Sequence, residues 1–528
     1  MFVPKTEYYN VYKEIQTLAY KCTVTVFASN GDADALCAYK ILAELFKHDS
    51  IPFCVIPVTS GVHLQQQAEM HLAEENEDRA VVLVNCGGTE DIQKILPALS
   101  EGSRVIIIDS HRPLNVNNIS TSNKGVLVFY EEGYEGVQEV FPDGGTDGED
   151  DEDDSDDEED DDEDGYRTGS RRRLSVEGEY EAQRVRREKR TRRAEQRSEL
   201  LSYYSRGSFF GQAAGWTIYN LAHQLARETN ELLWWAIVAL TDQHLHQRIT
   251  KEMYELGVSA MNTEIVSKQG TMTLEDGMEL RIAADSSISI RDEFCFFHLR
   301  HWNLSDAMVH SPYVATTLKT WEEKGTKKLQ RLYARMGVPL AACQQKYSHM
   351  TADYARQLEA KLEEYGREVG LNNLKFTSFC MDRGHKLQVS ASDVALGAAA
   401  LLEGPSGGSA DWTDNWRRAA TALSFTEVDA LLAGIQVSMS YQRTIVTQAG
   451  LAISRKLVYS NGAHMFRIYN LKDECSGSDA AALVNPQVLT RFALFLQEEI
   501  SLGKARRRAL VVVAPEVPGS VSDAEGGG

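Results

Sequence analysis

The sequence has no apolar run long enough to cross a membrane. Its longest, "LLWWAIVAL" at 232–240, has nine residues, whereas a membrane-spanning helix needs about 20. The first residues, "MFVPKTEYYNVYKEIQ", are charged early and contain no apolar core of a secretory signal. These absences exclude an integral membrane protein and predict a soluble intracellular protein that makes no membrane contact.

The sequence also lacks paired cysteines. It holds eight, at positions 22, 37, 54, 86, 295, 343, 380 and 475, and no two have C-x-x-C spacing. This disfavours zinc ribbons and thioredoxin-like redox sites. Their places inside apolar stretches predict reduced, mostly buried thiols.

Positive charge is in deficit, since the net charge is −22. Most of the excess lies in one tract, "EDDEDDSDDEEDDDED" at 149–164, which holds 15 acids in 16 residues and follows Asp143 and Asp147. Removing these 17 charges leaves −5, so the rest of the chain is only mildly acidic. A block of like charges cannot bury itself, so residues 143–166 are predicted to be a disordered linker.

A basic stretch follows, and residues 167–204 are predicted to form a charged helix. Its two clusters have the spacing of a bipartite nuclear import signal, with candidate residues Arg171, Arg172, Arg173, Arg186, Arg187, Lys189 and Arg190. The alternatives are a solvated helix that has no targeting function and a helix that contacts nucleic-acid phosphates. Ser155 and Ser175 lie in acidic and basic surroundings, respectively, that resemble kinase sites, so both are phosphorylation candidates.

Strands and helices alternate in the first part of the chain. Strands are predicted at 23–28, 53–58, 79–84, 104–109 and 125–130, and helices at 35–47, 62–76 and 89–99. Near-continuous apolar strands separated by helices indicate a parallel sheet that is covered on both faces. Helical periodicity returns at 216–243 and dominates 249–390, and strand-like runs at 456–459, 464–469 and 509–514 mix with helices beyond. The fold class is therefore α/β.

Polar residues follow three of the predicted strands, and a fourth candidate follows the apolar run at 232–240. They are Asp32 and Asp34 after the first strand, Asn85 after the third, Asp109, Ser110 and His111 after the fourth, and Asp242. Sites form at the carboxyl ends of strands in an open parallel sheet. Each residue also has a plain structural explanation, since an Asp before a helix is often an N-cap. Convergence on one sheet edge favours a site.

These residues resemble the motifs of the DHH phosphoesterase superfamily, which includes RecJ-type exonucleases and manganese pyrophosphatases. The resemblance implies a two-metal centre that activates water and binds phosphate. The sequence departs from it twice, because Asn85 stands where an Asp is expected and Ser110 where the first His is expected. A neutral amide cannot bridge two metal ions, and a hydroxyl is a weak ligand for a transition metal. We therefore predict an inactivated site without metal or cofactor.

Motifs along the whole chain narrow the resemblance further. They are "DADALCAYKIL", "VNCG", "DSHRP", "ELLWWAIVALTDQ", "HWNLSDAM", "SPYVATTLKTW", "KKLQRLYARMGVPL" and "SASDVAL", in that order. Together with the acidic tract and the basic helix, they resemble the cell division control protein 45 family from residue 1 to about 516. Family members usually continue past "LVVVAPE" with a further strand and helix, whereas this chain has a Gly-rich tail. The completeness of its C-terminal domain is therefore in question.

The resemblance implies a domain plan. It consists of a DHH-like α/β domain at 1–142 that is completed by 205–248, the linker and basic helix between them, a mainly helical interdomain at 249–390, a smaller DHHA1-like α/β domain at 391–516, and a disordered tail at 517–528.

The resemblance also implies a function. It implies a nuclear, non-catalytic subunit of the replicative helicase that works with the MCM ring and the GINS complex, at origin chromatin and at forks, and that contacts single-stranded DNA. Two rivals stay open at this point. One is an active manganese-dependent exonuclease or phosphoesterase, against which Asn85 and Ser110 argue. The other is a nuclear scaffold that uses its acidic tract as a histone mimic, which only the linker supports.

Overall fold

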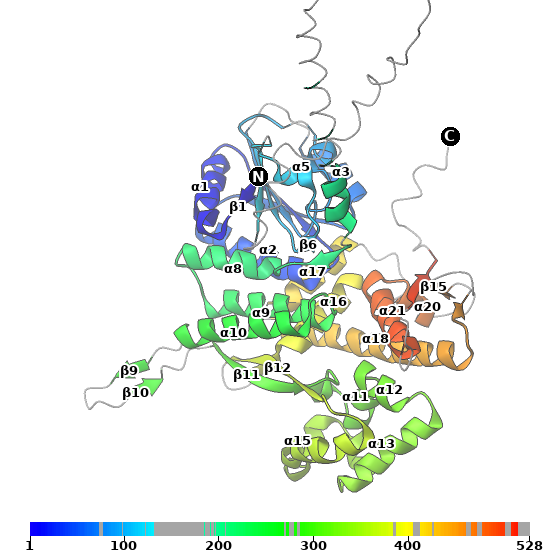
Figure 1. Cartoon of the computed structure of the whole chain (residues 1–528). Coiled ribbons are helices and arrows are strands. Elements are labelled where there is room, and N and C mark those ends of the chain that lie inside the picture. The colour runs from blue at the N-terminus through cyan, green and yellow to red at the C-terminus, as the bar shows by residue number, and fades with distance from the viewer. Residues whose placement is uncertain are drawn as a thin grey trace, which may run out of the picture.

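Figure 1 shows the chain as a computed structural model. The structure describes all residues except 73–77, 98, 122, 131–183, 185–190, 192–194, 196, 206, 269–270, 274–278, 282–285, 384–386, 405–411, 425–426, 461–465, 472–477, 502–507 and 516–528. The predicted acidic linker at 143–166, most of the basic helix and the tail at 517–528 lie outside the described residues. Among the described helices, none is both long and apolar enough to span a bilayer.

A six-stranded sheet forms the N-terminal part, in the order β1-β7-β5-β4-β2-β3. All its neighbouring strands pair in parallel. The strands are β1 (Phe2–Val3), β2 (Val24–Ser29), β3 (Phe53–Val58), β4 (Ala80–Val84), β5 (Arg104–Ile108) and β7 (Val126–Phe129). The five strands predicted from the sequence are confirmed within two residues at each end. β1 was not predicted, because two residues carry no periodicity.

Helices cover both faces of this sheet, as its apolar strands predicted. Val82 of β4 packs in the cluster with α1 (Tyr8–Ala19), α2 (Ala33–His48), α8 (Ala214–Gln224) and α9 (Asn230–Leu245). Its neighbours Val81 and Leu83 pack with α3 (Gly61–His71), α4 (Ile92–Ile95) and α5 (Val116–Ile119) on the other face. The fold class is thus confirmed.

Three helical predictions differ in extent, and the one at 62–76 is α3, which ends at His71. The helix predicted at 89–99 is only the four residues of α4, since Leu96 is extended before Pro97 and a residue before proline avoids the helical region. The run predicted at 216–243 is two helices, because α8 ends at Gln224 and Ala226 has a positive φ of 52°. The segment that carries them returns to the sheet through β8 (Phe209–Phe210), which pairs antiparallel with β6 (His111–Arg112).

The middle of the chain contains a sheet that the sequence did not predict. β11 (Ser286–Phe294), β12 (Lys375–Arg383) and β13 (Leu387–Ser390) form an antiparallel sheet. β11 pairs with β12, a strand about 90 residues away, so no local sequence pattern predicts this pairing. The remaining elements here are α10 (Lys251–Lys268), the hairpin β9 (Thr271–Thr273) and β10 (Glu279–Arg281), α11 (Leu304–Val309), α12 (Pro312–Leu318), α13 (Glu323–Arg335), α14 (Leu340–Gln344) and α15 (Ala352–Gly366). Helices α11, α13 and α15 lie far from the N-terminal sheet (Figure 1).

The C-terminal part mixes helices with a second small sheet. β14 (Tyr459–Ser460), β15 (Phe466–Asn470) and β16 (Ala509–Val513) form it, close to the three predicted runs. The helices are α16 (Ala391–Glu403), α17 (Trp412–Ala422), α18 (Val428–Ser454), α20 (Ser478–Leu483) and α21 (Pro486–Ser501). α16 packs in the cluster with α2 and α9, so the C-terminal part rests against the N-terminal part.

Candidate functional site

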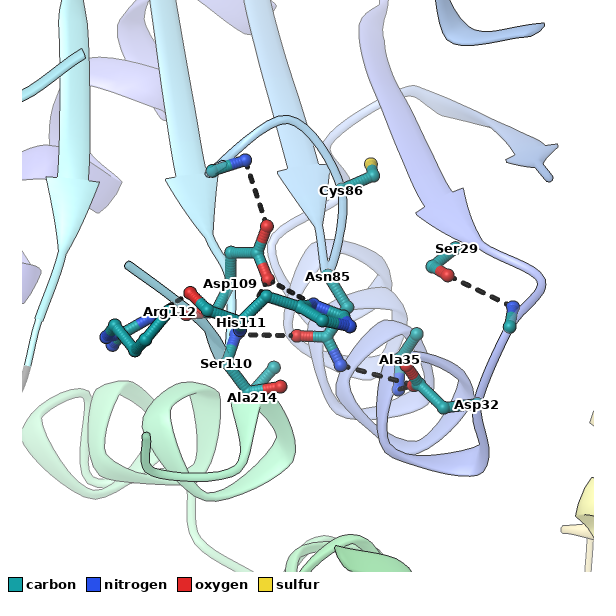
Figure 2. Close-up of polar contacts among 12 residues, drawn as sticks. Ser29, Asp32, Ala35, Asn85, Cys86, Asp109, Ser110, His111, Arg112 and Ala214 are labelled. Carbon is teal, nitrogen blue, oxygen red and sulfur yellow. Dashed lines mark hydrogen bonds and ion pairs between the residues drawn. The ribbon is translucent and has the colours of Figure 1, made fainter. Parts of the chain in front are cut away.

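The strand ends bring Asp32, Asn85 and residues 109–111 to one edge of the sheet (Figure 2). Asp32 follows β2, Asn85 follows β4, and Asp109 to His111 follow β5. β2, β4 and β5 are neighbours in the sheet, so their carboxyl ends lie side by side. The convergence predicted from the sequence is therefore present at this edge of the sheet.

Asn85 is the centre of the arrangement. Its Nδ2 donates to Asp32 Oδ1 at 3.2 Å and to Asp34 Oδ2 at 2.9 Å, and its Oδ1 accepts from the backbone N–H of Ser110 at 2.9 Å. The residue is buried and has a positive φ of 49°. An amide nitrogen thus lies between two carboxylates, where an ionised Asp at 85 would have no hydrogen to donate.

Asp32 and Asp34 both serve helix starts. Asp32 is the N-cap of α2, and its Oδ1 accepts from Ala35 N–H at 2.6 Å, as the plain explanation predicted. Asp34 accepts from the N–H groups of Ala214 and Gly215, at 2.9 and 2.8 Å, at the start of α8. Burial, with the neighbouring charge of Asp32, raises the pKa of Asp34 to about 7.

Asp109 and His111 form a local pair. Asp109 Oδ1 lies 2.7 Å from His111 Nδ1 and accepts from His111 N–H, while Oδ2 accepts from Gly88 N–H at 2.9 Å. Burial alone would raise the pKa of Asp109, but its contacts with His111 lower it, and the carboxylate in turn raises the pKa of His111 against the effect of burial. Ser110 contributes its backbone, since its carbonyl accepts from Gly211 N–H at 2.7 Å.

Asp242 lies near the end of α9 and holds two partners that the sequence reasoning missed. Its Oδ2 accepts from Arg248 Nη1 at 2.9 Å, and its Oδ1 lies 3.0 Å from His246 Nδ1. Burial raises the pKa of Asp242, but these two side chains outweigh it and the pKa is lowered. The i, i+4 spacing from Asp242 to His246 is a signal that could have identified His246. Arg248 lies beyond the helix and has no such signal.

The donors around these carboxylates decide whether the site fits a pair of metal ions. Asp34 and Asp109 each accept from two or more N–H groups, and Oδ2 of Asp242 accepts from Arg248 Nη1. A two-metal centre needs free carboxylate oxygens and a bridging carboxylate, whereas position 85 is an amide that points its hydrogens inward. The residues present do not fit such a centre. Within the described ranges, no group of three or more His, Cys, Asp or Glu could hold a metal ion.

The remaining predicted residues lie in the linker and the basic stretch. Arg171, Arg172, Arg173, Arg186, Arg187, Lys189, Arg190, Ser155 and Ser175 all fall outside the described residues. The import and phosphorylation predictions therefore stay predictions.

Comparisons with known proteins agree on one family. The family model named CDC45 matches residues 24–520. The Cell division control protein 45 homolog of Schizosaccharomyces pombe is 32% identical over 97% of this chain and 88% of its own length, and the Homo sapiens homolog is 28% identical over 86% and 78%. The crystal structure of CDC45 from Entamoeba histolytica superposes with a TM-score of 0.69 at 20% identity, covering 98% of this chain and 87% of that one. The last similarity confirms the fold.

Proposed function

This chain belongs to the CDC45 family, and from that premise we propose that it acts in DNA replication as a non-catalytic subunit of the replicative helicase. Membership makes it a DNA replication factor. The finer proposal is that it joins the MCM ring and the GINS complex, acts in origin activation and fork progression, and contacts single-stranded DNA in the nucleus.

One observation carries the non-catalytic part of the proposal. The amide of Asn85 donates to both Asp32 and Asp34, so the space between these carboxylates is filled by a hydrogen-bond donor. Hydrolysis of a phosphodiester by a two-metal centre would require divalent cations between these carboxylates. The carboxylates that remain are occupied in holding helices and loops.

The first experiment measures manganese-dependent degradation of labelled single-stranded DNA by the purified protein. We expect no degradation above that of a mock purification. The matched variant is Asp32→Ser, which removes the carboxylate and keeps an oxygen that can cap α2. Degradation by the unmodified protein that disappears in a folded Asp32→Ser variant would show that the chain is an exonuclease and that the proposal is wrong.

The second experiment tests the partners. Tagged protein purified from S-phase cells should co-elute with MCM and GINS subunits, and its rapid depletion should stop incorporation of a labelled nucleoside. Co-elution of neither complex, with normal DNA synthesis after depletion, would contradict the helicase role.

The third experiment tests localisation. Changing the basic candidates to Ala should leave a fluorescent fusion largely cytoplasmic; the changed residues are Arg171, Arg172, Arg173, Arg186, Arg187, Lys189 and Arg190. The control changes the exposed Lys324, Lys327 and Lys328 of α13, which should leave it nuclear. A nuclear fusion in both cases would show that this stretch is not the import signal.

A further inference from the structure

Arg248 is a buried cation beside the candidate site. Its side chain is 14% exposed, and Nη1 lies 2.9 Å from Oδ2 of the fully buried Asp242. Its guanidinium also lies over the ring of Phe210, 5.4 Å from the ring centre. Burial would lower the pKa of Arg248, but the charges of Asp242, Asp32 and Asp34 raise it. The guanidinium therefore pairs directly with one of the site's buried carboxylates, that of Asp242.

These carboxylates need a counter-charge when they are ionised. Asp32, Asp34 and Asp242 are each at most 3% exposed, and an uncompensated buried carboxylate is strongly unfavourable. Hydrogen bonds from Asn85, Ala214 and Gly215 stabilise two of them without supplying a full positive charge. Arg248, the partner of Asp242, brings a permanent positive charge.

Groups at this edge of the sheet also hold the chain segment that follows the linker. Asp34 accepts from Ala214 and Gly215, which lie 180 and 181 residues later in the sequence. Gly211 donates to the Ser110 carbonyl and accepts from Gln243 Nε2 at 3.3 Å. Asp34 and the Ser110 carbonyl thus connect residues before the linker with residues after it.

We propose that Arg248 is a built-in counter-ion that takes the place of divalent cations among these carboxylates, with the Asn85 amide filling the space between Asp32 and Asp34. On this assignment, the site has become a junction that fixes segment 209–248 to the sheet. Arg248 is then a positioning residue whose charge, more than its shape, keeps divalent cations out. The inference uses neither the replication role nor any partner.

A local ion pair between Arg248 and Asp242 is the simpler alternative, and the two ideas predict different responses to cations. If Arg248 merely pairs with Asp242, its loss lowers stability and nothing more. If it replaces divalent cations, its loss leaves a group of carboxylates that a divalent cation can stabilise, because a ligand bound only by the folded state raises the Tm.

The experiment measures the Tm of the full chain with and without Mn²⁺ or Mg²⁺, and after addition of a chelator. Arg248→Met removes the charge and keeps an unbranched apolar side chain. We expect it to lower the Tm and to produce a saturable recovery of about 3 °C or more with Mn²⁺ that the chelator reverses. The unmodified protein and Arg248→Lys, which keep a cation, should show no such recovery. Adding Asn85→Asp to Arg248→Met should enlarge it.

Arg227→Met is the matched control. Arg227 pairs with Asp49 away from the site, and its side chain is 24% exposed. We expect a lower Tm without a response to divalent cations. This variant separates the effect of losing any arginine from the effect of losing the one among these carboxylates.

Three outcomes would overturn the inference. They are a folded Arg248→Met variant whose Tm ignores divalent cations, an unmodified protein that Mn²⁺ stabilises equally, and an Arg248→Lys variant that fails to fold along with Arg248→Met. If Arg248→Met is soluble only when Mn²⁺ is present, the inference is supported. Failure to co-elute with MCM and GINS subunits would instead contradict the proposed function, so the two failures are distinguishable.

Discussion

Replacing Asp393 with Asn tests a buried cluster that joins the loop at His298 to helices α16 and α18. His298 lies between β11 and α11 and has a fully buried side chain. Its Nδ1 lies 2.8 Å from Oδ1 of Asp393 on α16, and its Nε2 lies 2.8 Å from Oγ of Ser438 on α18. Asp393 Oδ2 also lies 3.4 Å from His301 Nε2. The carboxylate therefore holds two imidazoles of the middle region against the C-terminal helices.

The size of the effect follows from burial and charge. A hydrogen bond to an ionised carboxylate contributes about 1.5–3 kcal/mol, and leaving a buried donor without its partner costs about 1–3 kcal/mol. Asn keeps one acceptor and loses the charge, so we expect Asp393→Asn to lower the free energy of unfolding by about 3 kcal/mol. Ser438→Ala removes a neutral hydrogen bond and should cost about 1 kcal/mol.

The pH dependence has a definite sign. Burial raises the pKa of Asp393, but the contacts with His298 and His301 outweigh it and hold the pKa well below its usual range. A carboxyl whose pKa is depressed by folding contributes stability above its unfolded pKa, about 3.8, and loses it as the pH falls through the folded pKa. The deficit of the Asn variant should thus persist at neutral pH and shrink below about pH 4.

Urea unfolding followed by tryptophan fluorescence and by far-UV circular dichroism measures these differences. Two probes are needed because the parts of a large chain can unfold separately. The control is Asp429→Asn at the exposed start of α18, where we expect a change of about 0.5 kcal/mol or less. The reasoning is refuted if Asp393→Asn costs no more than Ser438→Ala.

Three further predictions concern other parts of the chain. Burial raises the pKa of Glu403 to about 7, so its ionisation destabilises the folded state as the pH rises from about 4.5 through 7. Relative to Glu403→Gln, the unmodified protein should lose at most about 3 kcal/mol of unfolding free energy between pH 5 and 8 in urea titrations, and a difference that does not change with pH would contradict this. A Cβ at Gly434 would lie 2.5 Å from the carbonyl oxygen of Gly397, so Gly434→Ala should force α18 from α16 and lower the Tm, whereas Gly125→Ala, with 3.9 Å to its nearest neighbour, should not. Deleting residues 143–165 should leave the Tm nearly unchanged, because so acidic a tract has nothing to bury, and a loss of several degrees would refute that.

The N-terminal fold and the position of the site were predictable because their signals are local. Val81, Val82 and Leu83 belong to a short run of consecutive apolar residues, which is typical of a strand buried on both faces. The polar residues immediately after such strands must meet at one sheet edge. The pairing of β11 with β12 was not predictable, since it depends on contacts between residues such as Ile290 and Phe379 that lie far apart in the sequence. Arg248 was missed for another reason, since it lies beyond the end of α9 and has no helical spacing to Asp242.

The presence of Asp32, Asp34 and Asp109 at this edge needs no catalytic explanation. Asp32 caps α2, Asp34 receives the first N–H groups of α8, and Asp109 holds His111 and the Gly88 backbone. Losing an N-cap acceptor alone costs about 1 kcal/mol, and leaving a buried N–H without a partner costs about 1–3 kcal/mol. These costs oppose substitution whether or not a phosphate is ever hydrolysed at this edge. The carboxylates alone are consequently weak evidence that a reaction takes place at this edge of the sheet. The amide of Asn85 donates to Asp32 and Asp34, which an ionised carboxylate could not do, and it is the stronger indicator of a structural role.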